Sequence, residues 1–294
     1  MPSLKEVRNR IASTDSTRKI TSAMKMVSAS KLRRSQQSIV QLRPYARKLN
    51  ELLSNLSSSI NAEENPLFKE KDNIKSVLLI VISSNRGLCG GFNSNILKHT
   101  TKLVTETYKN QYESEKVKFI TIGKRATEYI SKRFGNILAS HDYLTEHPSF
   151  EKISEIADML MAKFSINEFD RIEIIFHEFK NAASQVLINE VFLPIQPPAI
   201  VDDKKFSQAE YIYQPDKVSI TEDLIPKILR LQLYKSVLDS VASEHGARMT
   251  AMHKATDNAT ELLKDLKLVY NKARQASITK EILEIVSGAE ALGG

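Results

Sequence analysis

The spacing of hydrophobic residues predicts a long helix at the start of the chain. Two heptad seams mark residues 1–60: Leu4, Val7 and Ile11, and then Ile39, Leu42, Ala46, Leu49, Leu53, Leu56 and Ile60. Between them the register slips, and a stripe of Ile20, Met24 and Val27 stands among small and polar residues. Pro44 would normally kink or end a helix. We expect a kinked helix that spans roughly 80 Å.

A second long helix is predicted at the other end, over residues 217–294. Alternating steps of four and three residues run from Leu224 to Ala273, and 12 of the 15 positions are apolar. A periodic pattern of this length is typical of a coiled coil. The two helices can pair antiparallel if the intervening segment returns the chain to its starting point. The far end of such a pair needs a socket in another protein.

The middle of the chain alternates between strand and helix patterns. The expected strands are 76–82, 117–122, 171–177 and 185–193, and the expected helices are 93–110, 124–134 and 150–166. Strands separated by helices predict a largely parallel sheet, and the last two strands predict an antiparallel edge.

The fold class is therefore α/β. It combines a long antiparallel two-helix coiled coil, formed by the N- and C-terminal helices, with an inserted Rossmann-like α/β domain of mainly parallel strands. The expected limits are 1–60 for the N-terminal coiled-coil helix, 61–75 for a linker, 76–193 for the α/β domain, 194–216 for a second linker and 217–294 for the C-terminal coiled-coil helix.

Charge is concentrated at one end of the chain. Of the net +7, residues 1–50 hold 12 Lys and Arg against 2 acidic residues, whereas residues 51–216 hold 19 against 23. This imbalance predicts an acidic partner for the N-terminal arm: nucleic acid, anionic lipid or an acidic protein surface.

No stretch reaches the roughly 20 apolar residues of a membrane span. The first residues lack a signal core, so we expect a protein of the cytosolic side.

A glycine-rich loop, SSNRGLCGGFN at residues 83–93, follows the apolar run VLLIVI. The spacing G-x-x-G-G matches neither a dinucleotide fingerprint nor a P-loop. No acidic residue ends the second strand, where a ribose hydroxyl would be bound. We interpret the loop as a structural strand-to-helix turn. Its defining residues are Arg86, Gly87, Cys89, Gly90 and Gly91.

The sequence offers no candidate catalytic residue, metal ligand set or cofactor site. The six histidines show no spacing typical of a metal site. Cys89 is the single cysteine, and no base accompanies it, so a small buried thiol is the better interpretation.

Three long segments resemble the gamma subunit of F-type ATP synthase. They are KEVRNRIAS with TRKITSAMKMVSASKLRRSQ at the start, the loop SSNRGLCGGFN, and RMTAMHKATDNATELLKDLKLVYNKARQASITKEILEIVSGAEAL at the end. In the loop, Asn85 stands where the family often has Asp, and Phe92 where it often has Leu. The resemblance implies a non-catalytic rotor shaft that couples ion flow to ATP synthesis or hydrolysis at alpha–beta interfaces.

The resemblance also implies partners and a location. The expected partners are the alpha and beta subunits (one gamma per three of each), the epsilon subunit and the membrane c-ring, with no nucleic acid and no direct small-molecule substrate. The expected location is the cytoplasmic face of the bacterial plasma membrane, as a peripheral subunit, or alternatively the matrix side of the mitochondrial inner membrane.

Residue roles follow from the same resemblance. The positions that match family contacts with the alpha–beta ring are Arg8, Met24, Lys25, Arg33, Arg34, Arg248, Gln275, Thr279 and Glu284. Met24 and Val27 have an alternative role, which is packing on the C-terminal helix.

Two other functions are weighed against this one. A basic coiled-coil protein could bind nucleic acid, but the arm lacks the interleaved aromatic residues of single-strand binders. A nucleotide-binding enzyme could use the central domain, but the loop lacks the required Lys and ribose-binding acid.

Overall fold

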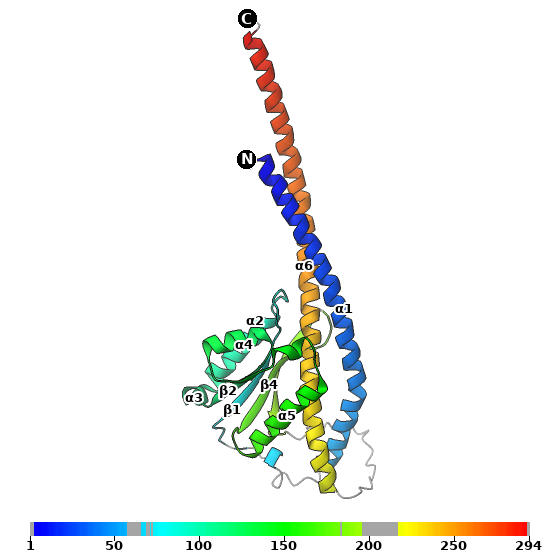
Figure 1. The fold of residues 1–294 in the computed structure, drawn as a ribbon, viewed down its shortest axis with the longest axis vertical. Coiled ribbons are helices and arrows are strands. Elements are labelled where there is room, and N and C mark those ends of the chain that lie inside the picture. Colours follow the sequence, from blue (N-terminus) through cyan, green and yellow to red (C-terminus); the bar gives the residue numbers. More distant parts are fainter. Residues whose placement is uncertain are drawn as a thin grey trace. The chain divides into compact units, whose positions relative to one another are not determined.

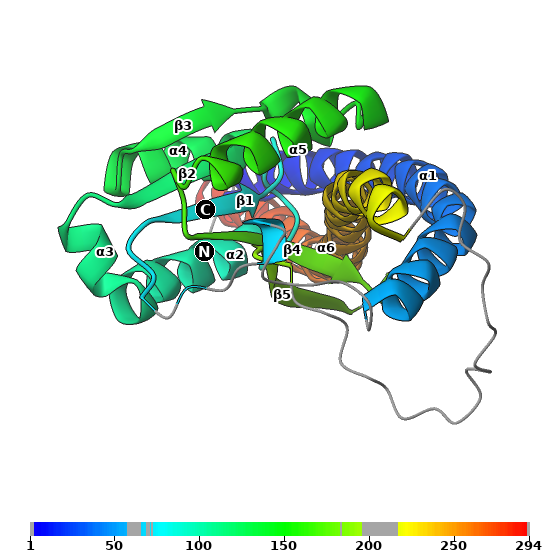
Figure 2. The ribbon, with the colours of Figure 1, turned by 90° about the horizontal axis from the view of Figure 1, so that it is seen from below.

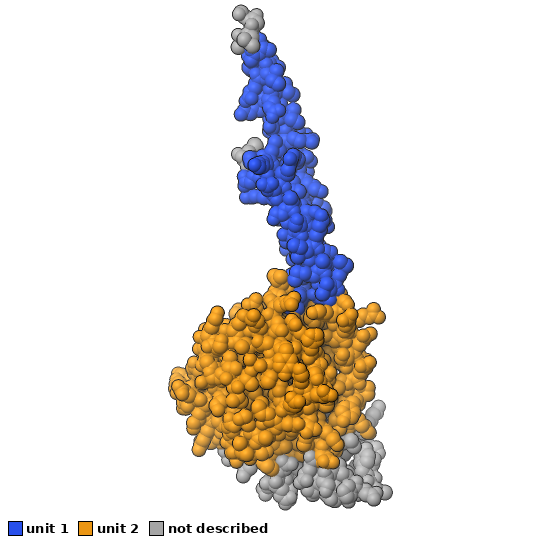
Figure 3. Space-filling model, in the orientation of Figure 1, with its two compact units in different colours: residues 1–28, 248–294 blue, residues 29–247 orange. Residues whose placement is uncertain are grey.

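The computed structural model of the chain describes residues 3–57, 66–68, 71, 73–182, 184–195 and 217–292. It separates into two compact units: residues 29–247, and residues 1–28 together with 248–294 (Figure 3). The second predicted linker, 194–216, lies largely outside the described residues, as do residues 61–65, 69, 70 and 72 of the first, 61–75.

A five-stranded sheet forms the centre of unit 29–247 (Figure 1). Its strands are β1 (Val77–Ile82), β2 (Val117–Ile122), β3 (Ile137–Ser140), β4 (Arg171–Phe179) and β5 (Gln185–Leu193), in the order β3-β2-β1-β4-β5. All neighbours are parallel except β4 and β5. The expected parallel sheet with an antiparallel edge is therefore confirmed. β3 was not predicted, because a strand of four residues is too short to show a clear alternation of apolar and polar positions.

Helices cover both faces of the sheet (Figure 2). One face packs on α2 (Phe92–Lys102), the π-helical turn η2 (Leu103–Thr107), α3 (Lys109–Glu113) and α4 (Lys124–Arg133). The other packs on α5 (Phe150–Ser165) and the first part of α6 (Lys217–Leu292). Two short 3₁₀ turns are η1 (Pro66–Phe68) and η3 (Asp142–Thr145). All six residues of β1 are buried, which explains its unbroken apolar run.

The predicted helix 93–110 is interrupted by the π turn. There the N–H of Tyr108 donates to the carbonyl of Leu103 at 2.9 Å, and the Tyr108 hydroxyl donates to buried Glu173 at 2.5 Å. Arg171 and Asn189 also donate to this carboxylate, at 2.6 and 2.8 Å. A π turn adds one residue to the helical path. Here the turn directly precedes Tyr108, whose hydroxyl binds the buried Glu173 carboxylate.

Helix α1 (Leu4–Ser57) continues through Pro44, as the single long helix expected from the sequence requires. Its buried side chains also keep one register. Among the residues of α1 whose burial the structure describes, they are Val7, Thr21, Ser28, Leu32, Ile39 and Leu49. Each interval is a sum of the three- and four-residue steps of a heptad seam. The predicted slip between two seams is therefore wrong: the seam continues through Thr21 and Ser28, whose hydroxyl side chains an apolar pattern does not include.

Helix α6 is buried on two sides in its first half. Leu231, Leu238 and Ala242 occupy the predicted seam, while Lys235 is exposed at a seam position. A second face joins the core on the sheet, through Ile225, Leu229, Leu233, Val237 and Val241. Within the described residues, no helix is both long and apolar enough to cross a membrane.

Candidate functional site: the glycine loop and the helix pair

The glycine loop leaves the carboxyl end of β1, the central strand. In the order β3-β2-β1-β4-β5, successive strands are added on one side of β1 up to β3 and on its other side from β4 onward. The boundary between β1 and β4 is thus a topological switch point, where open α/β sheets bind ligands. The position is therefore that of a nucleotide site. What decides its chemistry is whether backbone N–H groups remain available.

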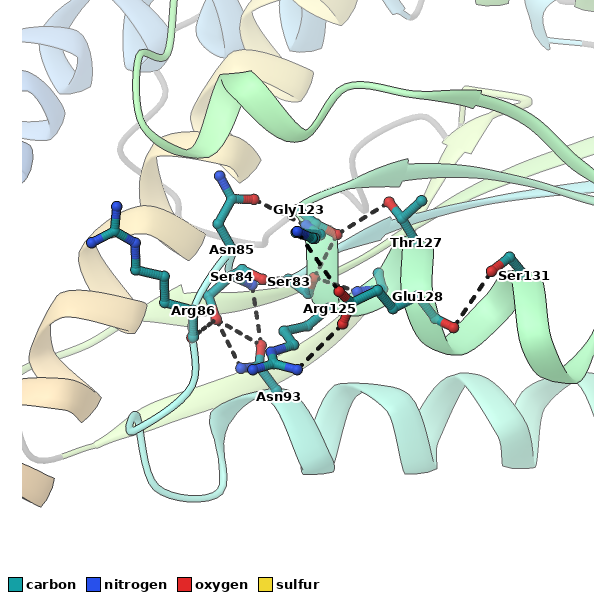
Figure 4. Close-up of polar contacts among 12 residues, drawn as sticks. Ser83, Ser84, Asn85, Arg86, Asn93, Gly123, Arg125, Thr127, Glu128 and Ser131 are labelled. Atoms are coloured by element: carbon teal, nitrogen blue, oxygen red, sulfur yellow. Dashed lines mark hydrogen bonds and ion pairs between the residues drawn. The ribbon is translucent and has the colours of Figure 1, made fainter.

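The N–H groups at the start of α4 are taken up by the loop itself (Figure 4). The Asn85 side-chain oxygen accepts from Lys124 N–H at 2.9 Å, the Ser84 carbonyl from Arg125 N–H at 3.1 Å, and the Ser83 hydroxyl from Ala126 N–H at 2.8 Å. These are the donors that a phosphate would use at a helix N-terminus. The chain fills this site with its own oxygen atoms.

A second set of bonds joins the loop to α2. The backbone N–H of Ser84 donates to the Asn93 side-chain oxygen at 3.1 Å, and Asn93 Nδ2 donates to the Cys89 sulfur at 3.2 Å. Cys89 is 2% exposed, in agreement with the predicted buried thiol. Asn85 Nδ2 donates to the carbonyl of Asp142 at 3.0 Å, which an aspartate at this position could not do.

Gly90 has a φ of 59°, which favours glycine, and the adjacent turn also places Leu88 at a φ of 62°. Leu88 is 64% exposed. The predicted loop residue Arg86 is exposed, and its guanidinium lies 3.8 Å from Glu146. Gly87 and Gly91 lack a positive φ. At Gly91 a Cβ would lie 3.2 Å from the Asn95 side chain, so the turn is tight there.

The helix pair of the other unit has a polar seam. On α1 the buried side chains are Val7, Thr21 and Ser28, and on α6 they include Met252, Ala259 and Leu263. The Thr21 and Thr256 hydroxyls are 2.8 Å apart and form a hydrogen bond across the seam. Nearer the start of α1, Arg8 Nη2 donates to the Tyr270 hydroxyl at 3.0 Å. This contact lowers the pKa of Tyr270, chiefly through the hydrogen bond from Arg8.

The predicted contact residues of α1 differ in exposure. Met24 and Lys25 are half-buried, whereas Arg33 and Arg34 are exposed. Val27 is 57% exposed, so its alternative role in packing on the C-terminal helix is wrong. The sequence analysis did not name Met26 as a candidate contact residue. Met26 is 65% exposed and, like Val27, is an apolar residue that lies outside the heptad seam, which is the pattern that could have identified it.

The predicted contact residues of α6 do not share one face. Gln275 and Thr279 are exposed one turn apart, and the Thr279 hydroxyl donates to the Gln275 carbonyl at 3.0 Å. Glu284 lies about 180° around the helix from Gln275 at 100° per residue, with its carboxylate 3.5 Å from Lys280. Arg248 is only 9% exposed. These roles stay predictions.

An apolar stripe near the end of α6 adjoins Gln275. Ile278, Ile282 and Ile285 are 48%, 55% and 71% exposed. Their positions fall within about 60° of one another around the helix. Leu283 and Val286 are also exposed. A stripe of this kind usually marks an interaction surface.

Comparison with known proteins identifies a family that matches almost the whole chain. The family described as "ATP synthase" matches residues 3–292. The ATP synthase gamma chain of Cytophaga hutchinsonii is 50% identical and covers 99% of this chain and 99% of its own length. The ATP synthase gamma chain of Flavobacterium johnsoniae is 51% identical over the whole of both chains.

The fold has counterparts among solved structures. A chain from the rotor of the Euglena gracilis mitochondrial ATP synthase is 21% identical, with a TM-score of 0.64, and the match covers 94% of this chain and 98% of that one. A second Euglena structure, of an assembly with OSCP, F1 and c-ring, contains a chain with a TM-score of 0.67 at 21% identity, matched over 98% of this chain and 94% of its own. On the full-length sequence matches, the chain belongs to the ATP synthase gamma chain family.

Proposed function

We propose that the chain is the non-catalytic central rotor of an F-type ATP synthase. Its helix pair turns within a ring of alternating alpha and beta subunits. Each angle of the shaft favours a different set of beta conformations, because the contact energies differ from one angle to the next. Ion flow through the membrane sector is thereby coupled to ATP synthesis or hydrolysis at the alpha–beta interfaces.

The exposed apolar stripe on α6 is the observation that carries this proposal. Three isoleucines one turn apart remain about half exposed or more in the chain alone, at 48%, 55% and 71%. Burying them would contribute about 25 cal/mol per Å² of apolar area. An apolar stripe makes few directional bonds, so it suits a surface that slides against its partner.

The glycine loop supports the non-catalytic part of the proposal. The N–H groups of Lys124, Arg125 and Ala126 are already bonded to oxygen atoms of Ser83, Ser84 and Asn85. A phosphate at the start of α4 would have to displace these bonds. The domain therefore keeps the shape of a nucleotide-binding fold and uses the loop to join β1, α2 and α4.

The full set of partners belongs to the same proposal. One copy of the chain serves three alpha and three beta subunits, and the α/β domain meets the epsilon subunit and the membrane c-ring. The complex lies on the cytoplasmic face of the bacterial plasma membrane, with the chain as a peripheral subunit. On the shaft, the ring contacts are made by Arg8, Met24, Lys25, Arg33, Arg34, Arg248, Gln275, Thr279 and Glu284.

Reconstitution tests the proposal. The purified chain is mixed with the alpha and beta subunits of the same source, and ATPase activity and subunit stoichiometry are measured. We expect the chain to be inactive alone and to yield an active complex with one copy per three alpha and three beta subunits. Failure to form a complex, together with salt-sensitive retention of nucleic acid, would overturn it.

Lys25 offers a sharper test of coupling. Replacing Lys25 with Gln removes one charge from a half-buried position on α1. We expect ATP-driven ion pumping to fall relative to ATP hydrolysis in membranes that carry the whole enzyme. Unchanged pumping per ATP would remove Lys25 from the contact set.

A further inference from the structure

The contact between Arg8 and Tyr270 joins the two helices of the shaft near the start of α1. Besides the 3.0 Å hydrogen bond, the guanidinium carbon of Arg8 lies 5.9 Å from the centroid of the Tyr270 ring. Tyr270 thus accepts a hydrogen bond from the Arg8 guanidinium through its hydroxyl and contacts the same cation with its aromatic ring. The two residues are 262 positions apart in the sequence.

In the unit of residues 1–28 and 248–294, α1 contributes few fully buried apolar side chains to the seam. Of the α1 residues in this unit, Val7 is the one apolar side chain among the buried ones, at 1% exposed, and it is the neighbour of Arg8. The other two, Thr21 and Ser28, are polar. Ser3 caps the start of α1, because it accepts from the N–H groups of Glu6 at 3.2 Å and Val7 at 3.1 Å. The N–H groups of Leu4 and Lys5 still have no acceptor within the helix, so this end frays unless tertiary contacts hold it.

Tyr270 also lies at the last covered part of α6. Beyond it, among the residues whose side chains the structure describes, only Ala273 and Ser277 are half-buried, and the others are exposed. The contact with Arg8 therefore stands where the paired part of the shaft gives way to a single helix.

We propose that Tyr270 is a positioning residue that fastens the beginning of α1 to α6 through Arg8. This inference rests on the proposed rotor function, and it changes the role of Arg8. The arginine acts on the ring indirectly, because its guanidinium holds the shaft together at the point where pairing ends. Loss of either side chain lets the first turns of α1 separate from α6.

A double-mutant cycle distinguishes this role from direct contact between Arg8 and the ring. The variants are Arg8→Gln, Tyr270→Leu and the two combined, each reconstituted with the alpha and beta subunits. Hydrogen exchange over residues 4–14 and the ATPase rate are measured on every complex. A clasp predicts that each single variant speeds exchange by about threefold to tenfold and that the double variant is no faster than either.

Two further variants make the outcome specific. Tyr270→Phe keeps the ring and loses the hydroxyl, so it should fall between the parent and Tyr270→Leu in both readouts. Arg10→Gln is the matched control, because Arg10 is an exposed arginine two residues away that pairs with Glu6 of the same helix at 3.3 Å. It should leave exchange and activity close to the parent.

The inference is overturned if Tyr270→Leu matches the parent in exchange, or if the effects of Arg8→Gln and Tyr270→Leu simply add. Either result would return Arg8 to direct contact with a partner. Failure of the parent chain to assemble would instead count against the rotor function. The exchange measurements on the unassembled full chain would still decide the clasp, since both residues belong to the same chain.

Discussion

Gly123 carries a strict backbone requirement at the end of β2. Its φ is 110°, and a Cβ placed there would lie 2.2 Å from the carbonyl oxygen of Ser83. That carbonyl belongs to the segment that caps α4. Gly135 is a useful comparison, because its φ of 68° is also positive but nothing lies within 4 Å of a Cβ.

We predict that Gly123→Ala destabilises the α/β unit by about 3–5 kcal/mol, since strain and overpacking act together. Gly135→Ala should cost about 1 kcal/mol, from the left-handed backbone alone. Urea unfolding of both variants, followed by circular dichroism, measures the two free energies. Equal losses in the two variants would show that the contact with Ser83 is relieved at little cost.

Asp239 is a buried carboxylate on α6, at 3% exposed. Burial raises its pKa to about 6, with Glu178 on β4 and Glu190 on β5 raising it further and Lys235 on α6 and Arg43 on α1 opposing the shift. A carboxyl with a raised folded-state pKa stabilises the fold below its ordinary pKa of 3.8, and this stability is lost as pH rises through about 6.

The substitution Asp239→Asn should therefore stabilise the chain at pH 8, by on the order of 1–3 kcal/mol. It should also remove the part of the pH dependence that falls between pH 4 and pH 6. Unfolding midpoints across this range, compared with those of the exposed control Asp257→Asn, test the effect. A loss of stability at pH 8 would mean that the ionised form is held by its cationic neighbours.

The sequence predicted that some of these residues matter, but it did not show which contacts make them necessary. The three loop glycines and the thiol of Cys89 were predictable, because glycine clusters and a lone cysteine between a strand and a helix are local signals. Gly123 and Asn93 were not. Their roles depend on which loops meet at the sheet edge, and that follows from the strand order rather than from neighbours in sequence.

At the scale of the element, α1 shows why a seam can be missed. Positions Thr21 and Ser28 continue the heptad of Val7, but a search for apolar spacing passes over hydroxyl residues. It follows Ile20 and Val27 instead, which are 60% and 57% exposed. The strands of the sheet were predictable because β1, β2 and β4 are buried on both faces and rich in β-branched residues.

The Thr21–Thr256 pair gives a prediction for the seam. Each hydroxyl has a carbonyl acceptor on its own helix, Arg18 for Thr21 at 3.1 Å and Met252 for Thr256 at 2.8 Å, so one hydroxyl donates across the seam while the other donates to its own helix. A single Thr256→Val substitution should therefore cost only about 0.5–1 kcal/mol, the net value of the crossing bond. The double variant Thr21→Val, Thr256→Val should be neutral or stabilising, because two β-branched apolar side chains then meet in the seam.

Thermal unfolding of the single and double variants measures this difference. Thr260→Val is the matched control: Thr260 is exposed, and its hydroxyl makes the same bond to its own helix, to the Thr256 carbonyl at 2.8 Å. If the double variant is less stable than the single one, the hydroxyl pair is itself the preferred seam contact.

At the scale of the whole molecule, charge is the property that sequence describes without any structure. The excess of 12 basic over 2 acidic residues lies in the first 50 positions, while residues 217–294 are nearly balanced, at 11 against 10. Arg33 and Arg34 are exposed on α1. An exposed basic segment attracts an acidic partner before contact forms, so its main effect is on the rate of association.

We predict that Arg33→Gln with Arg34→Gln slows association with the alpha and beta subunits by about threefold to tenfold at low salt. The difference should shrink as salt rises, because mobile ions screen the attraction, and the dissociation rate should change little. Lys264→Gln with Lys267→Gln removes the same charge from exposed positions of α6 and should slow association less. Association kinetics at several salt concentrations test both variants, and equal slowing in the two would mean that net charge, rather than its position on α1, guides assembly.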